Sequence, residues 1–223
     1  MSKKSVLSNQ KNANRHPARF KALRYMLLVT VSVVLLGLMV VFLAWKRYQN
    51  IAKTEAMTLA RSVESQLHAE HIQEFTGTEQ DTELSDYQMV KRSLSNLIET
   101  NDQIRFAYII GLREGKILFL LDSEPVTSPD YSPPGQIYTE AKAEDLLPFL
   151  TGEPIITGPT EDRWGTWYSA LIPIMDLEKD SVIAVLGLDY AAAEWDQRVL
   201  IRMMPNVVTT ICLCSLCLGF AWI

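Results

Sequence analysis

Polar and aromatic side chains interrupt the apolar segments in the middle of the chain, and these residues are the best suited to hold a small molecule. Small-molecule sites are mostly apolar hollows with a few convergent polar groups. Taken one at a time, the tryptophans are better explained as core residues and the charged residues as loop positions in water. Taken together, they favour a binding site. The candidate set is Tyr108, Asp122, Tyr131, Arg163, Trp164, Trp167, Ser169 and Asp189.

Metal and catalytic chemistry find little support in the sequence. His68 and His71 form the string HAEH rather than HExxH, and a spacing of three residues places the two imidazoles only roughly on one helical face. The sequence has no GxSxG string, no glycine-rich phosphate loop and no Cys/His nucleophile pair. We therefore expect no metal, no cofactor and no catalytic residue in this stretch. Whether a longer parent protein is an enzyme stays open.

A hairpin must position the last candidate residues. The apolar runs Trp167–Met175 and Val182–Asp189 are rich in branched and aromatic residues, and the polar connector Asp176–Ser181 joins them. This pattern predicts two antiparallel strands. Because side chains alternate along a strand, Trp167 and Ser169 should share one face of the first strand. Asp189 should end the row of Ile183, Val185 and Gly187 on the second strand.

The other expected elements give an α+β order, with helices packed on an antiparallel sheet. Helical spacing predicts helices, and a Glu-Gly pair between two apolar runs predicts a second hairpin. The four prolines of Pro125–Gly135 predict an extended loop. The elements are helices Lys46–Phe75, Tyr87–Thr100, Thr139–Leu150 and Ala191–Arg202, and strands Ile104–Arg113 and Lys116–Asp122.

Two apolar segments flank this region. Met26–Trp45 is 20 residues without a charge, enough to span about 30 Å of bilayer core. The seven basic residues before it predict a disordered cytoplasmic tail over residues 1–25, by the positive-inside rule. Val207–Ile223 is short for a span, so we expect residues 199–223 to be a second, truncated transmembrane helix. Residues 46–198 would then form one extracytoplasmic domain.

Charge and cysteine usage exclude some partners. Residues 46–198 carry 13 basic against 26 acidic residues, a net charge of −13. Such a domain repels phosphates, so we expect no nucleic-acid partner. The three cysteines, Cys212, Cys214 and Cys217, all lie in the second apolar segment, and we interpret them as small apolar residues of a membrane helix.

Several strings resemble a known family. FAYIIGLREGKILFLLDSEP, DYSPPGQIY and GPTEDRWGTWYSALIPI…VIAVLGLD are similar to the periplasmic Cache sensors, also described as PAS-like or PDC domains, of bacterial membrane-bound histidine kinases and diguanylate cyclases. The resemblance covers roughly Lys46 to Arg198. It implies a long N-terminal helix on a central antiparallel sheet, with a ligand pocket on the membrane-distal side.

The resemblance also implies roles for individual residues. In amino-acid-binding Cache domains, an Arg-x-Trp-type element and a later Asp hold the carboxylate and the amine of the ligand. Here Arg163 and Trp167 are spaced differently, whereas Asp189 ends its strand as the family pattern requires. The class of ligand is therefore open.

The resulting functional hypothesis is the ligand-sensing input region of a multi-pass inner-membrane signalling protein. A histidine kinase of a two-component system is the first expectation for its output, with a diguanylate cyclase or a chemotaxis receptor as alternatives. A module for structure or dimerisation, without a ligand, is the competing class. The apolar stripe of Lys46–Phe75 offers a homodimer seam, or packs on its own sheet instead.

Overall fold

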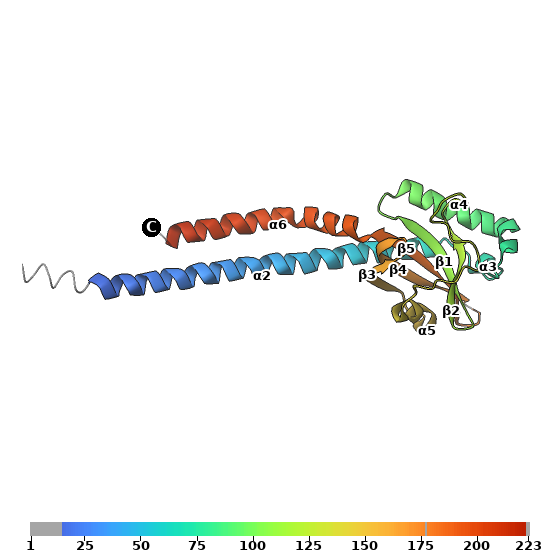
Figure 1. Cartoon of the computed structure of the whole chain (residues 1–223), viewed down its shortest axis with the longest axis horizontal. Helices are drawn as coiled ribbons and strands as arrows, with labels where there is room; N and C mark the ends of the chain where they lie inside the picture. The colour runs from blue at the N-terminus through green and yellow to red at the C-terminus, as the bar shows by residue number, and fades with distance from the viewer. Residues whose placement is uncertain (1–14, 177, 222–223) are drawn as a thin grey trace, which may run out of the picture. The chain divides into compact units, whose positions relative to one another are not determined.

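One antiparallel sheet organises the middle of the chain, within the residues that the structure describes, 15–176 and 178–221. In the computed structural model its strands lie in the order β2-β1-β5-β4-β3 (Figure 1). The predicted α+β fold with a central antiparallel sheet is confirmed. The strands are β1 (Phe106–Arg113), β2 (Lys116–Asp122), β3 (Ile155–Asp162), β4 (Gly165–Asp176) and β5 (Ser181–Ala191).

Both predicted hairpins are confirmed. Glu114 and Gly115 join β1 to β2 with φ angles of 49° and 74°, the left-handed conformation that tight hairpin turns require. In the other hairpin, Ser169 of β4 lies directly opposite Asp189 of β5. Because paired residues of an antiparallel ladder share a face, the two side chains meet; alternation alone did not predict this pairing, because it relates residues only within one strand.

The edge strand β3 was not predicted. It contains Gly158 and Pro159, and its register against β4 shifts between Thr157 and Thr160. Proline lacks the N–H that a central strand needs, but an edge strand with a bulge tolerates it. Gly158 has a φ of 105°, and a Cβ there would collide with the carbonyl oxygen of Trp167. Gly158 and Pro159 argue against a strand in the sequence, yet they are the residues that suit this strand to an edge position.

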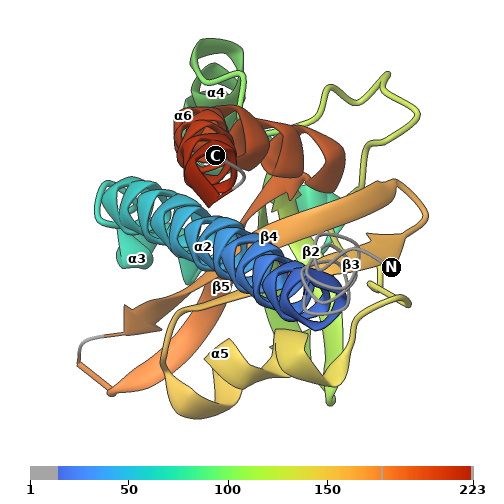
Figure 2. The same ribbon diagram turned by 90° about the vertical axis from the view of Figure 1, so that its left-hand side faces the viewer.

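Helices cover both faces of the sheet. The helices of the described residues are α2 (Arg15–Glu64), α3 (Ala69–Ile72), α4 (Ser85–Thr100), α5 (Leu147–Thr151) and α6 (Ala192–Ala221), with short 3₁₀ turns η1 (Glu79–Glu83) and η2 (Ala143–Leu146). Both views place α4 and α5 on opposite sides of the sheet (Figures 1 and 2). The predicted helix Tyr87–Thr100 is confirmed as α4.

Two helix predictions were wrong at their ends. The predicted helix Lys46–Phe75 ends at Glu64, after which the chain turns and buries Ile72 and Phe75. The Phe75 ring meets the Tyr87 ring of α4 at 5.5 Å, and this burial outweighs the helical pattern. The predicted helix Thr139–Leu150 begins only at Ala143, where the Asp145 carboxylate accepts the Lys142 N–H and fixes the start of η2.

The two faces of the sheet differ in composition. We call one the aromatic face; it carries Phe106, Tyr108, Ile110, Ile117, Phe119, Trp167, Leu171 and Val185, with α5 and partly buried Tyr138 and Trp164 packed against it. We call the other the aliphatic face; its buried residues include Ala107, Ile109, Ala170, Ile172, Leu186 and Leu188, each at most 3% exposed.

A β-bulge brings one more side chain to the aromatic face. In the β1–β2 ladder Ile110 pairs with Phe119, but Ile109 pairs with Leu121 and Tyr108 with Asp122, so Leu120 has no partner. Strict alternation would place Phe119 and Asp122 on opposite faces. The extra residue re-aims the strand end, and both side chains lie on the face of Tyr108.

The described chain divides into two compact units, one around the sheet, Gln49–Val199, and a helical one whose described residues are 15–48 and 200–221. Within the first unit, Gln49 joins its two ends: its Oε1 accepts the Trp195 indole N–H at 2.7 Å, and its Nε2 donates to Asp196 at 2.9 Å. Trp195 also stacks on Tyr168, with ring centroids 4.7 Å apart. We call this group the Gln49 bridge.

Two helical stretches, Leu23–Glu64 and Ala192–Gly219, are long and apolar enough to cross a membrane. Residues 15–25, predicted as part of a disordered tail, belong to α2, because extending a formed helix through Ala, Leu, Lys and Arg is easy. Residues 1–14 lie outside the described residues, as do 222–223 at the end of the second predicted span. The predicted exit helix and second span form one helix, α6.

Candidate ligand-binding site

Two adjoining hollows lie on the aromatic face. The first is lined by Phe106, Tyr108, Phe119, Asp122, Asp130, Ser132, Tyr138, Asp162, Trp164 and Asp189, and the second by Tyr108, Ile110, Tyr138, Asp145, Thr157, Thr160, Asp162, Trp167, Ser169 and Leu171. Their cavity volumes are about 20 and 10 Å³. Each holds about one water molecule, so the hollows must widen to admit anything larger.

Asp189 is the central polar group of this site. β5 lies between β1 and β4, so Asp189 is flanked by Phe106 on one side and Ser169 on the other. Its carboxylate is buried, 6% exposed, and accepts a 3.0 Å hydrogen bond from the Tyr108 hydroxyl and another from Ser169. Burial raises the pKa of Asp189 to about 7, although both hydrogen bonds lower it.

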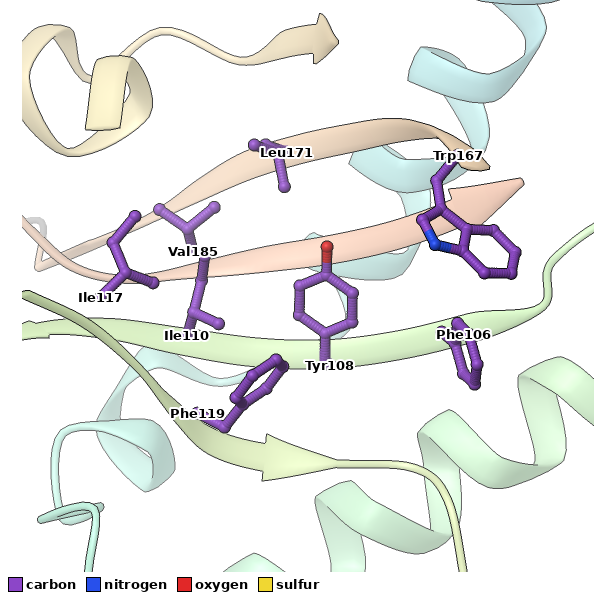
Figure 3. Close-up of a cluster of buried hydrophobic side chains, with 8 residues drawn as sticks. All are labelled: Phe106, Tyr108, Ile110, Ile117, Phe119, Trp167, Leu171 and Val185. Atoms are coloured by element: carbon purple, nitrogen blue, oxygen red, sulfur yellow. The ribbon is translucent and has the colours of Figure 1, made fainter. Parts of the chain in front are cut away.

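Tyr108 owes its position to a glycine on the next strand. It pairs with Gly187 of β5, and a Cβ at Gly187 would collide with the Tyr108 ring. The ring therefore lies flat over the glycine and reaches Asp189, two residues further along β5 (Figure 3 shows the ring among its neighbours). Glycine is needed here for close approach rather than for backbone conformation.

Asp162 organises the turn between β3 and β4. Its Oδ1 accepts the backbone N–H groups of Trp164 and Gly165, at 2.9 and 3.1 Å, and the indole N–H of Trp167 at 2.9 Å. Its Oδ2 accepts the Tyr138 hydroxyl at 3.1 Å. One carboxylate thus positions three aromatic residues at the hollows. This explains the role of the aspartate and the two tryptophans in the DRWGTW string.

Asp122 anchors the proline-containing loop over the site. Its two oxygens accept the backbone N–H groups of Glu124 and Ser132, at 3.0 and 2.7 Å. Burial raises the pKa of Asp122 to about 6, against the lowering effect of these bonds and of Lys91. Lys91 itself donates to the carbonyl oxygens of Asp122 and Glu124.

The structure brings six of the eight predicted residues to the hollows and leaves two outside their lining. Tyr131 lies under the Lys91 ammonium, 4.7 Å from ring centroid to Nζ. Arg163 pairs with Glu140 at 2.8 Å and stacks over Trp164 at 4.4 Å, with 43% of its side chain exposed. The six are Tyr108, Asp122, Trp164, Trp167, Ser169 and Asp189.

Sequence reasoning missed four lining residues that the geometry makes prominent: Phe106, Phe119, Tyr138 and Asp162. Phe106 was within reach, since it stands two residues before Tyr108 on the same strand face. Asp162 opens an Asp-x-x-Gly turn, which is a signal for side-chain capping of the turn. No local signal identifies Tyr138, because it meets Asp162 from a loop 24 residues away.

The two histidines of the HAEH string contact each other and a carboxylate. His71 Nδ1 lies 2.7 Å from a carboxylate oxygen of Asp86, and its ring meets that of His68 edge to face at 5.5 Å. Across the described residues, no group of three or more His, Cys, Asp or Glu is placed to hold a metal ion.

Comparison with known proteins gives a fold. No protein-family model and no curated protein matches the sequence. Among solved structures, the ligand-binding domain of the Campylobacter jejuni chemoreceptor Tlp3, in complex with 4-methylisoleucine, is similar at 16% identity with a TM-score of 0.50. The match covers 77% of this chain and 63% of that chain, so this chain spans less than two thirds of its relative.

Two further solved structures are less similar, with TM-scores below 0.5. They are the extracellular domain of mmHK1S-Z3, provisionally described as a histidine kinase (17% identity, 69% of this chain and 60% of that chain, TM-score 0.40), and a type II free methionine-R-sulfoxide reductase from Thermoplasma acidophilum (12% identity, 56% and 91%, TM-score 0.36). The Tlp3 match confirms the predicted fold, a helix-flanked antiparallel sheet, and carries no more than the fold.

Proposed function

We propose that this chain is the input region of a transmembrane receptor, and that its outer domain binds a small molecule at the hollows of the aromatic face. One observation carries the proposal: the carboxylate of Asp189 is buried in an aromatic hollow whose lining, among the described residues, includes no cation. Burying a carboxyl group without a charged partner costs free energy, so a core with a purely structural role would be destabilised by it. A ligand would supply the partner.

The proposed topology is a cytoplasmic tail over residues 1–25, a span over 26–45, an outer domain over 46–198 and a second span within 199–223. Two helices long and apolar enough for a membrane support it, as does the basic tail. The test is Thr127→Cys in a chain whose three native cysteines are alanine. An impermeant maleimide should label it in intact spheroplasts, whereas Ser8→Cys should react only after lysis. The reverse pattern would overturn the topology.

The path from site to membrane is short in sequence. Asp189 lies two residues before the end of β5, and α6 begins immediately afterwards at Ala192. A ligand shifts a conformational equilibrium only by its differential affinity for the two states. Binding that moves the end of β5 would therefore move the start of α6, and with it Trp195.

A homodimeric histidine kinase is the output that we propose first, with a diguanylate cyclase or a chemotaxis receptor as alternatives. Support comes from the resemblance of the strings around Asp130 and Trp164 to kinase-linked sensors. Sequencing the gene beyond the codon of Ile223 tests it. An H-box with ATP-binding motifs supports the kinase, whereas a GGDEF string or a methyl-accepting coiled coil selects an alternative. A stop codon there would contradict the proposal of an output domain on the same chain.

Ligand binding is tested by thermal melting of the full chain in detergent against a broad metabolite library. A ligand at 100 times its dissociation constant should stabilise the chain by about 2.7 kcal/mol. Ser169→Leu, which fills the second hollow, should remove the stabilisation. An absence of any hit, together with wild-type signalling by Asp189→Ala, would favour the structural alternative.

That alternative, a module for structure or dimerisation, has an observation of its own. The two hollows are nearly filled, with cavity volumes of about 20 and 10 Å³. The side chains would then form an ordinary core with polar groups bonded to one another. The library measurement separates the two functions, because a filled core has no site that a small molecule can stabilise.

A further inference from the structure

We propose that the ligand is a small organic ammonium ion that carries no carboxylate, bound with its charge between Asp189 and the aromatic rings of the hollows. The inference rests on the proposed function and deepens it by naming the chemical class of the ligand. It follows from the charge of the lining, the engagement of the nearby arginines and the arrangement of the rings.

The charge of the lining has one sign. Five aspartates border the two hollows, and within the described chain no lysine, arginine or histidine does: the acids are Asp122, Asp130, Asp145, Asp162 and Asp189. Four of them are already engaged, since Asp122, Asp145 and Asp162 accept backbone N–H groups and Asp130 pairs with Arg105. Asp189 receives only neutral hydroxyl donors. It is the carboxylate left to bind a cation.

The two nearby arginines are committed elsewhere. Arg105 bonds Glu124 at 2.6 Å and Asp130 at 2.8 Å, and its guanidinium lies 4.0 Å from the centroid of the Phe106 ring. Arg163 bonds Glu140 with two of its nitrogens and stacks on Trp164. The backbone donors of the β3–β4 turn, at Trp164 and Gly165, are taken by Asp162. A ligand carboxylate would therefore meet acids without a free guanidinium.

The rings form a continuous wall around this charge. Phe119 is the hub: its centroid lies 5.6, 5.7 and 5.9 Å from those of Tyr108, Tyr138 and Trp164, mostly edge to face. Trp167 and Phe106 continue the wall at 5.1 Å. Organic ammonium ions are attracted to the faces of such rings, most strongly to tryptophan, and the attraction grows as water is excluded.

The experiment compares molecules that differ by one group. Isobutylamine carries the ammonium group, L-valine is its carboxylated counterpart, and isobutanol is neutral and similar in shape. Tetramethylammonium carries the charge but cannot donate a hydrogen bond, so its binding depends on the rings and on the charge of Asp189 without a hydrogen bond to the carboxylate. Binding to the full chain in phosphatidylcholine nanodiscs is measured by titration calorimetry, with Asp189→Asn, Trp164→Leu and the exposed matched control Asp180→Asn.

We expect isobutylamine to bind at least tenfold more tightly than L-valine or isobutanol. Asp189→Asn should weaken amine binding at least tenfold, and Trp164→Leu should weaken tetramethylammonium binding about fivefold. Asp180→Asn should change neither affinity. Binding of the cation should also release a proton near neutral pH, seen as a dependence of the heat on the buffer.

Three results would overturn the inference. They are tighter binding of L-valine than of isobutylamine, amine binding that Asp189→Asn leaves unchanged, and the absence of amine binding up to millimolar concentration. None of these removes the proposed function if a metabolite of another class stabilises the wild-type chain and not Ser169→Leu. The proposed sensor function is contradicted by a separate result, namely that no compound in the metabolite library raises the melting temperature of the wild-type chain.

Discussion

The two faces of the sheet belong to the same strands but bury different kinds of residues. The aliphatic face buries Ile109, Leu186 and Leu188 completely. The aromatic face, one residue out of phase on the same strands, buries Asp189 and Asp122 beside rings that must be held in place by hydrogen bonds. Tight apolar packing gives stability, whereas buried polar groups reduce it. The first face therefore contributes most to holding the fold together, and the polar groups of the second are the basis of the ligand-binding proposal.

The largest loss of stability from a single substitution is expected on the aliphatic face. Leu186→Ala removes a fully buried side chain from β5 and should lower the free energy of unfolding by about 2–5 kcal/mol. Ligand affinity should stay within a factor of two, because the side chain points away from the hollows. Thermal melts and ligand titration of the same preparation measure both. A loss of affinity that tracks the loss of stability would show that the faces are not independent.

Asp189→Asn tests the cost of the buried carboxyl group. Its folded pKa, about 7, lies above that of an unfolded aspartate, so the native state holds a proton that the unfolded state releases. Wild-type stability should therefore fall as the pH rises from about 4 to about 7, by an amount on the order of 4 kcal/mol at most. The groups facing Asp189 are Tyr108 from β1, Ser169 from β4, Asp162 from β3 and Asp145 from η2.

Measured between pH 4.5 and 8, the Asn variant should show a smaller decline than the wild type and should be the more stable protein at pH 8. Part of the decline should remain, because burial also raises the pKa of Asp122, to about 6. Asp180→Asn, on the exposed connector, should keep the wild-type slope. Equal slopes in the wild type and Asp189→Asn would mean that Asp189 is ionised in the folded chain, and the contrast between the faces would lose its electrostatic part.

Gly187→Ala tests the seat of the Tyr108 ring. A methyl group there collides with the ring and should cost about 1–3 kcal/mol. It should also displace the hydroxyl from Asp189 and weaken ligand binding more than its effect on stability suggests. The double variant Gly187→Ala with Tyr108→Leu is the control, since the smaller side chain restores stability but not binding. Unchanged affinity in Gly187→Ala would remove Tyr108 from the site.

The smallest effect is expected at Arg163. Its pair with Glu140 is at the surface, with the arginine side chain 43% exposed, and such pairs contribute about 0–1 kcal/mol. Arg163→Gln should therefore change stability and ligand affinity little. A tenfold loss of affinity in a calorimetric titration would restore Arg163 to the ligand-binding set and would weaken the case for a ligand without a carboxylate.

Local periodicity predicted part of this site well. Alternation predicted that Trp167 and Ser169 share a face of β4 and that Asp189 ends a row on β5, because each strand is regular where those residues lie. The turn at Glu114-Gly115 was readable for the same reason: its chemistry is contained in two residues.

Other parts could not be predicted because they depend on partners distant in the sequence. Asp122 lies on the aromatic face only because of the bulge at Leu120. A bulge is a property of two paired strands and cannot be predicted from the sequence of one. Strand β3 was hidden by Gly158-Pro159, residues that fit only an edge. Arg163 looked like a ligand residue until its pairing with Glu140, 23 residues away, was known.

The Gln49 bridge makes the unit Gln49–Val199 suitable for insertion into another protein. Gln49 is its first residue, and Trp195 lies four positions before its last, Val199, so the bonds of 2.7 and 2.9 Å hold the two chain ends side by side. Domains whose ends lie close together can be inserted into a loop of another protein without pulling that loop apart. Residues 49–199 are therefore suited to insertion between two surface residues of a fluorescent protein. There, any change in the spacing of the two ends would be read as a change in emission.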